Sequence, residues 1–132
     1  MNFINYFSDN GYENPKIEST YPLLNDTVQN RIDHISITLK QPIKLSQANV
    51  SIYQKNGDNN ILRQTISSRS MYTSISNESY TVNIRLFKST FNRPGEKYFV
   101  KVDNNFVADA FTDEPILGIK KEIWTFNLGN SY

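Results

Sequence analysis

The sequence contains few side chains of the kinds that carry out chemistry. Its 132 residues include one histidine, His34, and no cysteine, which excludes a disulfide, a zinc–cysteine cluster and a thiol nucleophile. His34 has no second histidine and no methionine-rich segment to complete a metal site, so we interpret it as a solvent-facing or hydrogen-bonded structural residue. The sequence has no Ser-His-Asp arrangement, Gly-rich phosphate loop or nucleophile elbow. We therefore expect that the protein is not an enzyme and needs no cofactor.

Acidic residues in one segment offer a weak metal-site alternative. Asp103, Asp109 and Asp113, with Glu114 beside the last, supply carboxylate oxygens of the kind that bind Ca²⁺. Their spacing does not match an EF-hand loop, so a metal site needs the fold to bring them together. Such segments are more often solvated connections between strands, and both interpretations stay open at this stage.

Three aromatic residues at predicted strand ends or in loops are candidate binding residues: Tyr53, Tyr72 and Phe106. Exposed rings stack on sugars or anchor a protein partner, because they bury a large area at low entropic cost. The alternative is that these rings close the ends of a β-sandwich.

The charged side chains nearly balance. There are 14 Lys and Arg residues against 13 Asp and Glu residues, a formal net charge of +1, and this gives no electrostatic basis for binding nucleic acid or an anionic membrane. No apolar run approaches the roughly 20 residues that span a bilayer, and the N-terminus lacks the basic start and apolar core of a signal peptide. We therefore expect no nucleic-acid partner and no membrane insertion. Two origins stay open: a protein inside the cell, or a segment of a longer exported chain.

The apolar residues recur at every second position, which is the period of a half-buried strand. The pattern predicts five strands, over residues 35–39, 48–52, 80–86, 98–102 and 124–128. It is weaker over residues 16–19, 61–67 and 71–75. No stretch of ten or more residues shows a sustained helical pattern, so we expect at most one short helical turn.

Turn-forming residues separate these segments. Asn56-Gly57 tolerates the positive φ of a tight turn and predicts a hairpin between residues 48–53 and 61–67. Strands of this length without helices between them indicate an antiparallel β-sandwich, since their one-sided apolar faces need two sheets packed face to face. We expect one all-β domain of about seven to eight strands over residues 14–129. Residues 1–13 form an extension or an edge strand added by residues 3–7, and residues 130–132 form a tail.

Several segments in order resemble the S-layer-associated Ig-like family of bacterial surface proteins, and more loosely the copper-resistance periplasmic sandwich. They are PKIESTYP (15–22), ISITLKQPI (35–43), FNRPGEKY (91–98), the acidic loop 109–118 and IWTF (123–126). The resemblance covers about residues 14–128. It implies an Ig-like Greek-key sandwich.

We predict structural roles for five residues: Pro94, Gly95, Tyr98, Trp124 and Phe126. Pro94 and Gly95 form a tight turn ahead of Tyr98. In Greek-key sandwiches a tyrosine early in a strand buries its ring and returns its hydroxyl to the upstream backbone, an arrangement called the tyrosine corner. The alternative for Tyr98 is an ordinary core tyrosine with a hydrated hydroxyl. Trp124 and Phe126 are expected in the core, from the terminal aromatic strand.

The resemblance implies a non-catalytic Ig-like module of a larger extracellular or cell-surface protein, acting as a spacer, adhesion or protein-interaction domain. A carbohydrate-binding module that assists a glycan-active enzyme is the alternative, and it requires several exposed rings. A metal-binding sandwich is a third hypothesis. The expected partner is a protein or a cell-wall glycan. Open sheet edges leave room for a dimer, whereas polar side chains along them favour a monomer.

Overall fold

Alternating polar and apolar side chains are typical of strands with one buried face, and strands contain about half of the residues that the structure describes. The computed structural model describes residues 10–132, and within this range there are eleven strands and no helix. In chain order the strands are β1 (Ile17–Tyr21), β2 (Asp26–Val28), β3 (His34–Leu39), β4 (Ile43–Leu45), β5 (Asn49–Asn56), β6 (Asn59–Ser67), β7 (Thr73–Ile75), β8 (Thr81–Arg85), β9 (Lys97–Val102), β10 (Val107–Asp109) and β11 (Ile119–Leu128).

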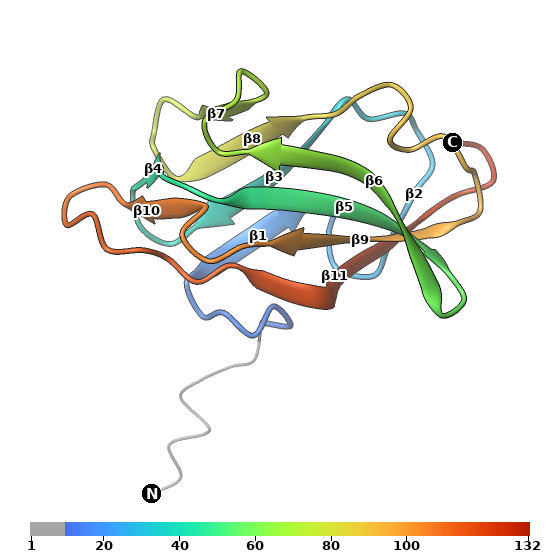
Figure 1. Ribbon diagram of the computed structural model, residues 1–132, viewed down its shortest axis with the longest axis horizontal. Helices are drawn as coiled ribbons and strands as arrows, with labels where there is room; N and C mark the ends of the chain where they lie inside the picture. The colour runs from blue at the N-terminus through green and yellow to red at the C-terminus, as the bar shows by residue number, and fades with distance from the viewer. Residues whose placement is uncertain (1–9) are drawn as a thin grey trace, which may run out of the picture.

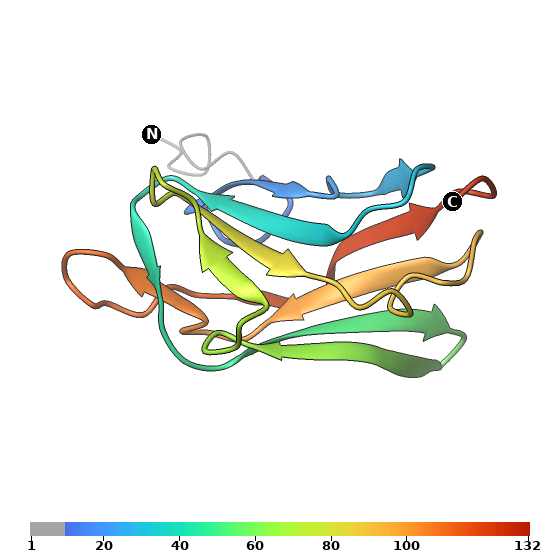
Figure 2. The ribbon, with the colours of Figure 1, turned by 90° about the horizontal axis from the view of Figure 1, so that it is seen from above.

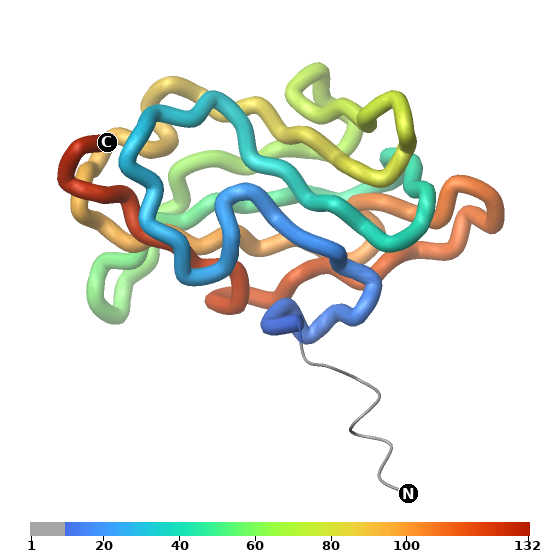
Figure 3. The backbone as a smooth tube through the Cα atoms, turned by 180° about the vertical axis from the view of Figure 1, so that it is seen from behind, coloured from blue at the N-terminus to red at the C-terminus, as the bar shows by residue number. Residues whose placement is uncertain are grey.

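The strands form two main sheets. One has the order β1-β3-β8-β7 and the other β2-β11-β9-β5-β6, while β10 and β4 form a small separate pair. Figure 1 labels the strands, and Figure 2 shows the two sheets as two layers. Seen from behind in Figure 3, β1, β3 and β8 cross in front of the five-stranded sheet. This all-β sandwich confirms the predicted fold class.

The chain changes sheets between β1 and β2. β1 pairs with β3 in the first sheet, and β2 pairs with β11 in the second. Trp124 anchors this crossing, because its indole nitrogen donates a 2.8 Å hydrogen bond to the carbonyl oxygen of Pro22. The β2–β11 pair is parallel, so the prediction of a purely antiparallel sandwich is wrong at this edge.

The core lies between the two sheets and comes from the inward positions of the strands. Trp124, Phe126 and Tyr98 are fully buried there. The ring of Phe91 meets both Phe126 and Tyr98 edge-on, with centroids 5.4 and 4.9 Å apart. The core positions predicted from the alternating pattern on β3 and β8 are also buried: Ile35, Ile37, Leu39, Val82 and Ile84.

The predicted segments coincide with strands, and the weak pattern over residues 61–67 lies in β6, which pairs with β5 in the predicted hairpin. Gly57 adopts a φ of +60° in the connection. Three strands were not predicted: β2, β4 and β10, each of three residues. Such short strands contain too few alternations to carry a period-two signal, which is why eleven strands replace the predicted seven to eight.

The turn before β9 forms as predicted, with Gly95 at a φ of +85° and the Glu96 N–H bonded to the Arg93 carbonyl. Tyr98 follows with its ring fully buried. Its buried hydroxyl has no hydrogen-bond partner among residues 10–132, so the returning bond of a tyrosine corner is not made. Burial raises the pKa of Tyr98, and the Arg93 backbone lies near enough to offset part of that rise.

The N-terminal segment packs on the sandwich where it enters the described range. Tyr12 is buried in the core and its hydroxyl lies 2.6 Å from the Thr20 hydroxyl. Asn14 donates through its amide to the Leu117 carbonyl at 2.7 Å. The edge strand predicted for residues 3–7 lies outside the described residues.

Candidate binding groove

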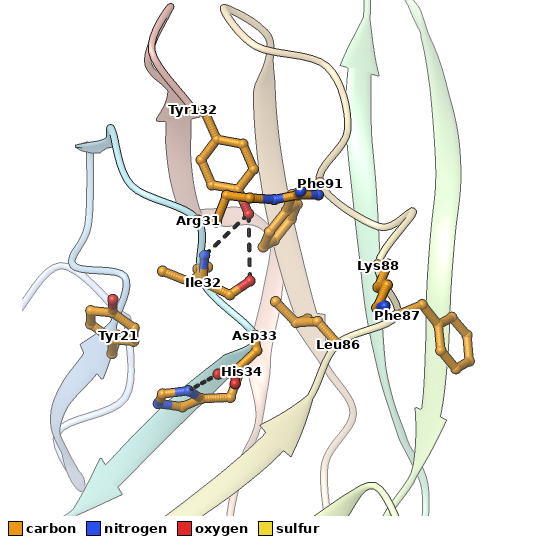
Figure 4. A pocket seen from close by; sticks show the side chains of 10 residues that line it. All are labelled: Tyr21, Arg31, Ile32, Asp33, His34, Leu86, Phe87, Lys88, Phe91 and Tyr132. Atoms are coloured by element: carbon orange, nitrogen blue, oxygen red, sulfur yellow. Dashed lines mark hydrogen bonds and ion pairs between the residues drawn. The ribbon is translucent and has the colours of Figure 1, made fainter.

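A groove lies at the end of the sandwich where β3 begins and β8 ends. It has a volume of about 510 Å³, and Figure 4 shows its lining side chains. One wall comes from the β1 end and the connection before β3, and the other from the segment after β8. The lining residues are Tyr21, Arg31, Ile32, Asp33, His34, Leu86, Phe87, Lys88, Phe91 and Tyr132. We call this the His34 groove.

Strand register sets the position of His34. As the first residue of β3 it pairs with Arg85, the last residue of β8, so β3 begins where β8 ends. Tyr21 ends β1 on the other side of β3 and stacks on the His34 ring, with centroids 5.4 Å apart and an interplanar angle of 29°. Tyr21 remains 44% exposed. The rings therefore present an aromatic surface to solvent.

The Asp33 carboxylate is a second group that contacts the His34 ring. The Asp33 carboxylate lies 2.9 Å from Nδ1 of His34, and this hydrogen bond, with a smaller contribution from the charge of Arg85, holds the pKa of Asp33 below its ordinary value. Asp33 is therefore ionised at neutral pH. His34 is thus partly exposed and hydrogen-bonded to Asp33.

The second wall is attached to edge strand β6 by two side chains, the buried Gln64 and the partly exposed Arg63. Gln64 accepts hydrogen bonds from the Phe87 backbone N–H and the Thr90 hydroxyl, and donates to the Arg85 carbonyl. Arg63 donates to the Ser89 and Thr90 carbonyls. This segment carries Lys88 and Phe87, and Figure 4 shows the Phe87 ring turned away from Arg31 and His34.

The upper end of the groove is closed by the last residue. The Tyr132 hydroxyl lies 3.4 Å from the Ile32 nitrogen and 3.5 Å from its carbonyl oxygen, and both contacts are drawn in Figure 4. Buried Leu86 and Phe91 form the apolar base. The groove thus combines an apolar base with a charged rim.

A second hollow of about 380 Å³ adjoins the His34 groove and shares Asp33 and His34 with it. Its other lining residues are Met71, Tyr72, Ser74, Asn83 and Arg85. Ser74 and Asn83 are register partners on β7 and β8. This hollow therefore extends the groove across the β8 and β7 side of the four-stranded sheet.

The three aromatic residues predicted to bind a ligand have different environments. Phe106 is 1% exposed and belongs to the core, so the prediction of an exposed ring there is wrong. Asn105 turns the chain with a φ of +66° immediately before it. Tyr53 is half-buried on the outer face of the five-stranded sheet, where it stacks on Phe99 at 5.0 Å. Tyr72 lines the second hollow and meets Phe87 edge-on.

The carboxylates proposed as calcium ligands are engaged with protein donors. Asp109 accepts from the backbone N–H groups of Phe111 and Thr112 and from the Gln41 amide. Asp103 lies 3.3 Å from the Lys101 ammonium and accepts from the Asn49 backbone, and Asp113 pairs with Lys44. No group of three or more His, Cys, Asp or Glu side chains in residues 10–132 is arranged to hold a metal ion. The structure therefore does not assemble the calcium site considered from the sequence.

Sequence reasoning missed Tyr21, Arg31, Asp33 and Lys88 as a group. The available signal was the run RIDH at residues 31–34, which places a cation, an acid and the only histidine at the start of a predicted strand. Lys88 lies more than 50 positions further along the chain, and only the fold brings it to the same groove.

Comparisons of the chain with models of known protein families, with curated proteins and with solved structures find no match. Within residues 10–132, no helix has the length and apolar character required to cross a membrane.

Proposed function

We propose that the protein is a non-catalytic Ig-like module of a larger extracellular or cell-surface protein and serves as an adhesion or interaction domain. The observation that carries this proposal is the strand order. β1-β3-β8-β7 corresponds to the ABED sheet of immunoglobulin-like domains, and β11-β9-β5 to their GFC sheet. This correspondence supports an Ig-like arrangement of the strands.

One further position supports the Ig-like assignment, and a second departs from it. In these domains a tyrosine near the start of strand F packs at the corner that follows strand E, and Tyr98 has that place on β9 with its ring buried. A buried tryptophan is also typical of the core, although Trp124 lies on β11, the counterpart of strand G, rather than on strand C.

The His34 groove is the surface that we assign to partner binding. Immunoglobulin-like domains commonly bind through the connections at one end of the sandwich, because these vary without disturbing the core. The groove lies among connections at one end of the sandwich, between the connection that precedes β3 and the segment that follows β8. In the strand correspondence above this end is opposite the B–C and F–G loops of variable domains, so the assignment depends on the groove itself and on the general use of connecting segments for binding. It is concave, and its charged rim gives it the capacity to select a partner.

The test is a titration of isotope-labelled protein with separate glycan and protein fractions of cell-surface material. We expect amide signals of Tyr21, His34 and Lys88 to shift, with no new product released from either fraction. Product formation would contradict the non-catalytic assignment. Shifts that leave the groove signals unchanged would contradict the assignment of the binding surface.

A carbohydrate-binding module is the second candidate, because one feature of the groove favours it. The Tyr21 and His34 rings stack beside the groove, and Tyr21 is 44% exposed. A sugar ring packs its C–H face on an aromatic surface while nearby polar groups bond its hydroxyls. Ser74 and Asn83 in the adjoining hollow supply such groups. Binding of a soluble glycan that changes neither the Tyr21 nor the His34 signals would contradict this candidate.

A further inference from the structure

We propose that the His34 groove binds an acidic oligosaccharide, that is, one carrying a carboxylate on a sugar ring. This inference rests on the carbohydrate-binding candidate and names the class of sugar. Three observations support it: two cations without hydrogen-bond or ion-pair partners among residues 10–132, an aromatic surface with a carboxylate beside it, and the continuity of the two hollows.

The cations come from opposite walls of the groove. Arg31 precedes β3 and Lys88 follows β8, and both side chains are exposed. The ion pairs found in residues 10–132 involve other lysines and His34, and the Arg31 and Lys88 side chains make no hydrogen bond there. Asp33 also lines this hollow but forms no ion pair with either cation. Two cations that face one hollow without an ion-pair partner among residues 10–132 favour an anionic ligand, and Arg matches a carboxylate through two parallel N–H bonds.

The remaining lining favours a sugar over an acidic peptide. Asp33 is ionised and lies in both hollows, so a run of acidic side chains would be repelled there. Sugar hydroxyls instead donate hydrogen bonds to a carboxylate. The Tyr21 ring, which stacks on the His34 ring, lies on the same rim. A ligand with one carboxylate, several hydroxyls and an apolar ring face meets all of these groups.

The size of the site fits more than one sugar ring. The two hollows of about 510 and 380 Å³ share Asp33 and His34, and small-molecule sites usually have volumes of about 300–1,000 Å³. We place the carboxylate between Arg31 and Lys88, one ring against Tyr21, and a further ring toward Asn83.

The experiment is a set of calorimetric and NMR titrations with three acidic sugars: trigalacturonate, a hyaluronan tetrasaccharide and sialyllactose. Methyl-esterified trigalacturonate keeps the rings and removes the charge, and hexaglutamate supplies carboxylates without sugar. We expect at least one acidic sugar to bind and to shift the Tyr21 and His34 signals. We expect much weaker binding of the esterified trimer and of hexaglutamate.

Variants locate the contact. Arg31→Gln combined with Lys88→Gln should weaken binding of that sugar about tenfold, since each exposed charge contributes modestly, and added salt should weaken wild-type binding. Lys40→Gln is the matched control, because Lys40 is an exposed cation just past the opposite end of β3. It should leave the affinity unchanged. Thermal unfolding of each variant checks that the fold is intact.

Three results would overturn the inference: no binding of any acidic sugar at about 10 mM, equal affinity of the double variant and the wild type, or tighter binding of hexaglutamate than of the sugars. Groove signals that shift with a protein fraction of cell-surface material, but with none of the sugars, would refute the sugar and leave the interaction-module proposal standing.

Discussion

The wall of the groove that carries Lys88 depends on one buried amide, and replacing Gln64 with leucine tests this directly. The Gln64 side chain is 3% exposed and makes three hydrogen bonds, to Arg85, Phe87 and Thr90. Leucine has a similar size and fills the site without donors or acceptors. The substitution therefore removes the bonds while largely keeping the packing.

The expected loss follows from counting those bonds. Each buried hydrogen bond contributes about 1 kcal/mol net, and each partner left unsatisfied costs about 1–3 kcal/mol. The Thr90 side chain is fully buried and loses its acceptor. Burial of the leucine side chain offsets part of the loss, by about 1–2 kcal/mol. We expect Gln64→Leu to lower the free energy of unfolding by about 3 kcal/mol, which is roughly a 10 °C fall in melting temperature.

The neighbouring strand offers a matched control. Gln54 on β5 is also buried, and its side-chain oxygen has no hydrogen-bond partner among residues 10–132. Gln54→Leu removes an unsatisfied polar group, so we expect unchanged or slightly increased stability.

The assay is urea unfolding of both variants, monitored by tryptophan fluorescence. Each folded variant is also titrated with a ligand that binds in the His34 groove. Gln64→Leu should also weaken binding through the loosened segment 86–90, whereas Gln54→Leu should not. If the two variants have unfolding free energies within about 0.5 kcal/mol of each other, then Gln64 does not hold this wall and the reasoning is refuted.

Three further predictions concern the core and the loops. Tyr98→Phe removes a buried hydroxyl that has no hydrogen-bond partner within residues 10–132, so the free energy of unfolding should stay unchanged or rise by up to about 1 kcal/mol. Because burial raises the Tyr98 pKa in the folded protein, the stability of the wild type, but not of the variant, should fall above about pH 10, where the unfolded tyrosine ionises. A loss above about 1 kcal/mol on urea unfolding would indicate that the tyrosine-corner bond forms. Gly118→Ala places a Cβ against the Val102 carbonyl oxygen, and overpacking of this kind costs about 1–3 kcal/mol; an unchanged melting temperature would contradict the close approach. Hydrogen bonds from the backbone N–H groups of Thr112 and Phe111 hold the pKa of Asp109 below its ordinary 3.8. The ionised Asp109 therefore contributes fully to the stability of the fold above pH 3.8, and this contribution is lost as the pH falls through the lower pKa of the folded state. Asp109→Asn should therefore flatten the acid limb of a stability-against-pH curve, and parallel curves would contradict this.

The sequence was most informative where several alternations follow one another. β3 and β8 carry three or more period-two repeats including their flanking residues, and the apolar positions within the two strands are buried as that pattern predicts. Tyr80, which begins the repeat just before β8, is instead 40% exposed. The pattern did not predict β10, which has only three residues. It was also interrupted within β11, where the pairing register shifts between Ile119 and Trp124 and Glu122 adopts a φ of +67°. Irregular backbone has no two-residue period.

Exposure and the groove were harder to predict, because both depend on contacts between distant segments. Phe106 directly follows the polar turn residues Asn104 and Asn105, so the local sequence indicated an exposed ring. The turn at Asn105 instead directs the ring into the core. His34 and Lys88 line one groove only because β3 and β8 pair and Gln64 holds the segment after β8. No local motif encodes that arrangement.

Hydrogen–deuterium exchange of the intact chain, with and without cell-surface material, tests the assignment of the His34 groove as the binding surface most directly. We predict slower exchange in residues 31–34 and 86–91, which contain lining residues of the two walls, and unchanged exchange in the loop that joins β10 to β11. Protection confined to that loop or to the outer face of β5 and β6, or no protection anywhere, would contradict the assignment.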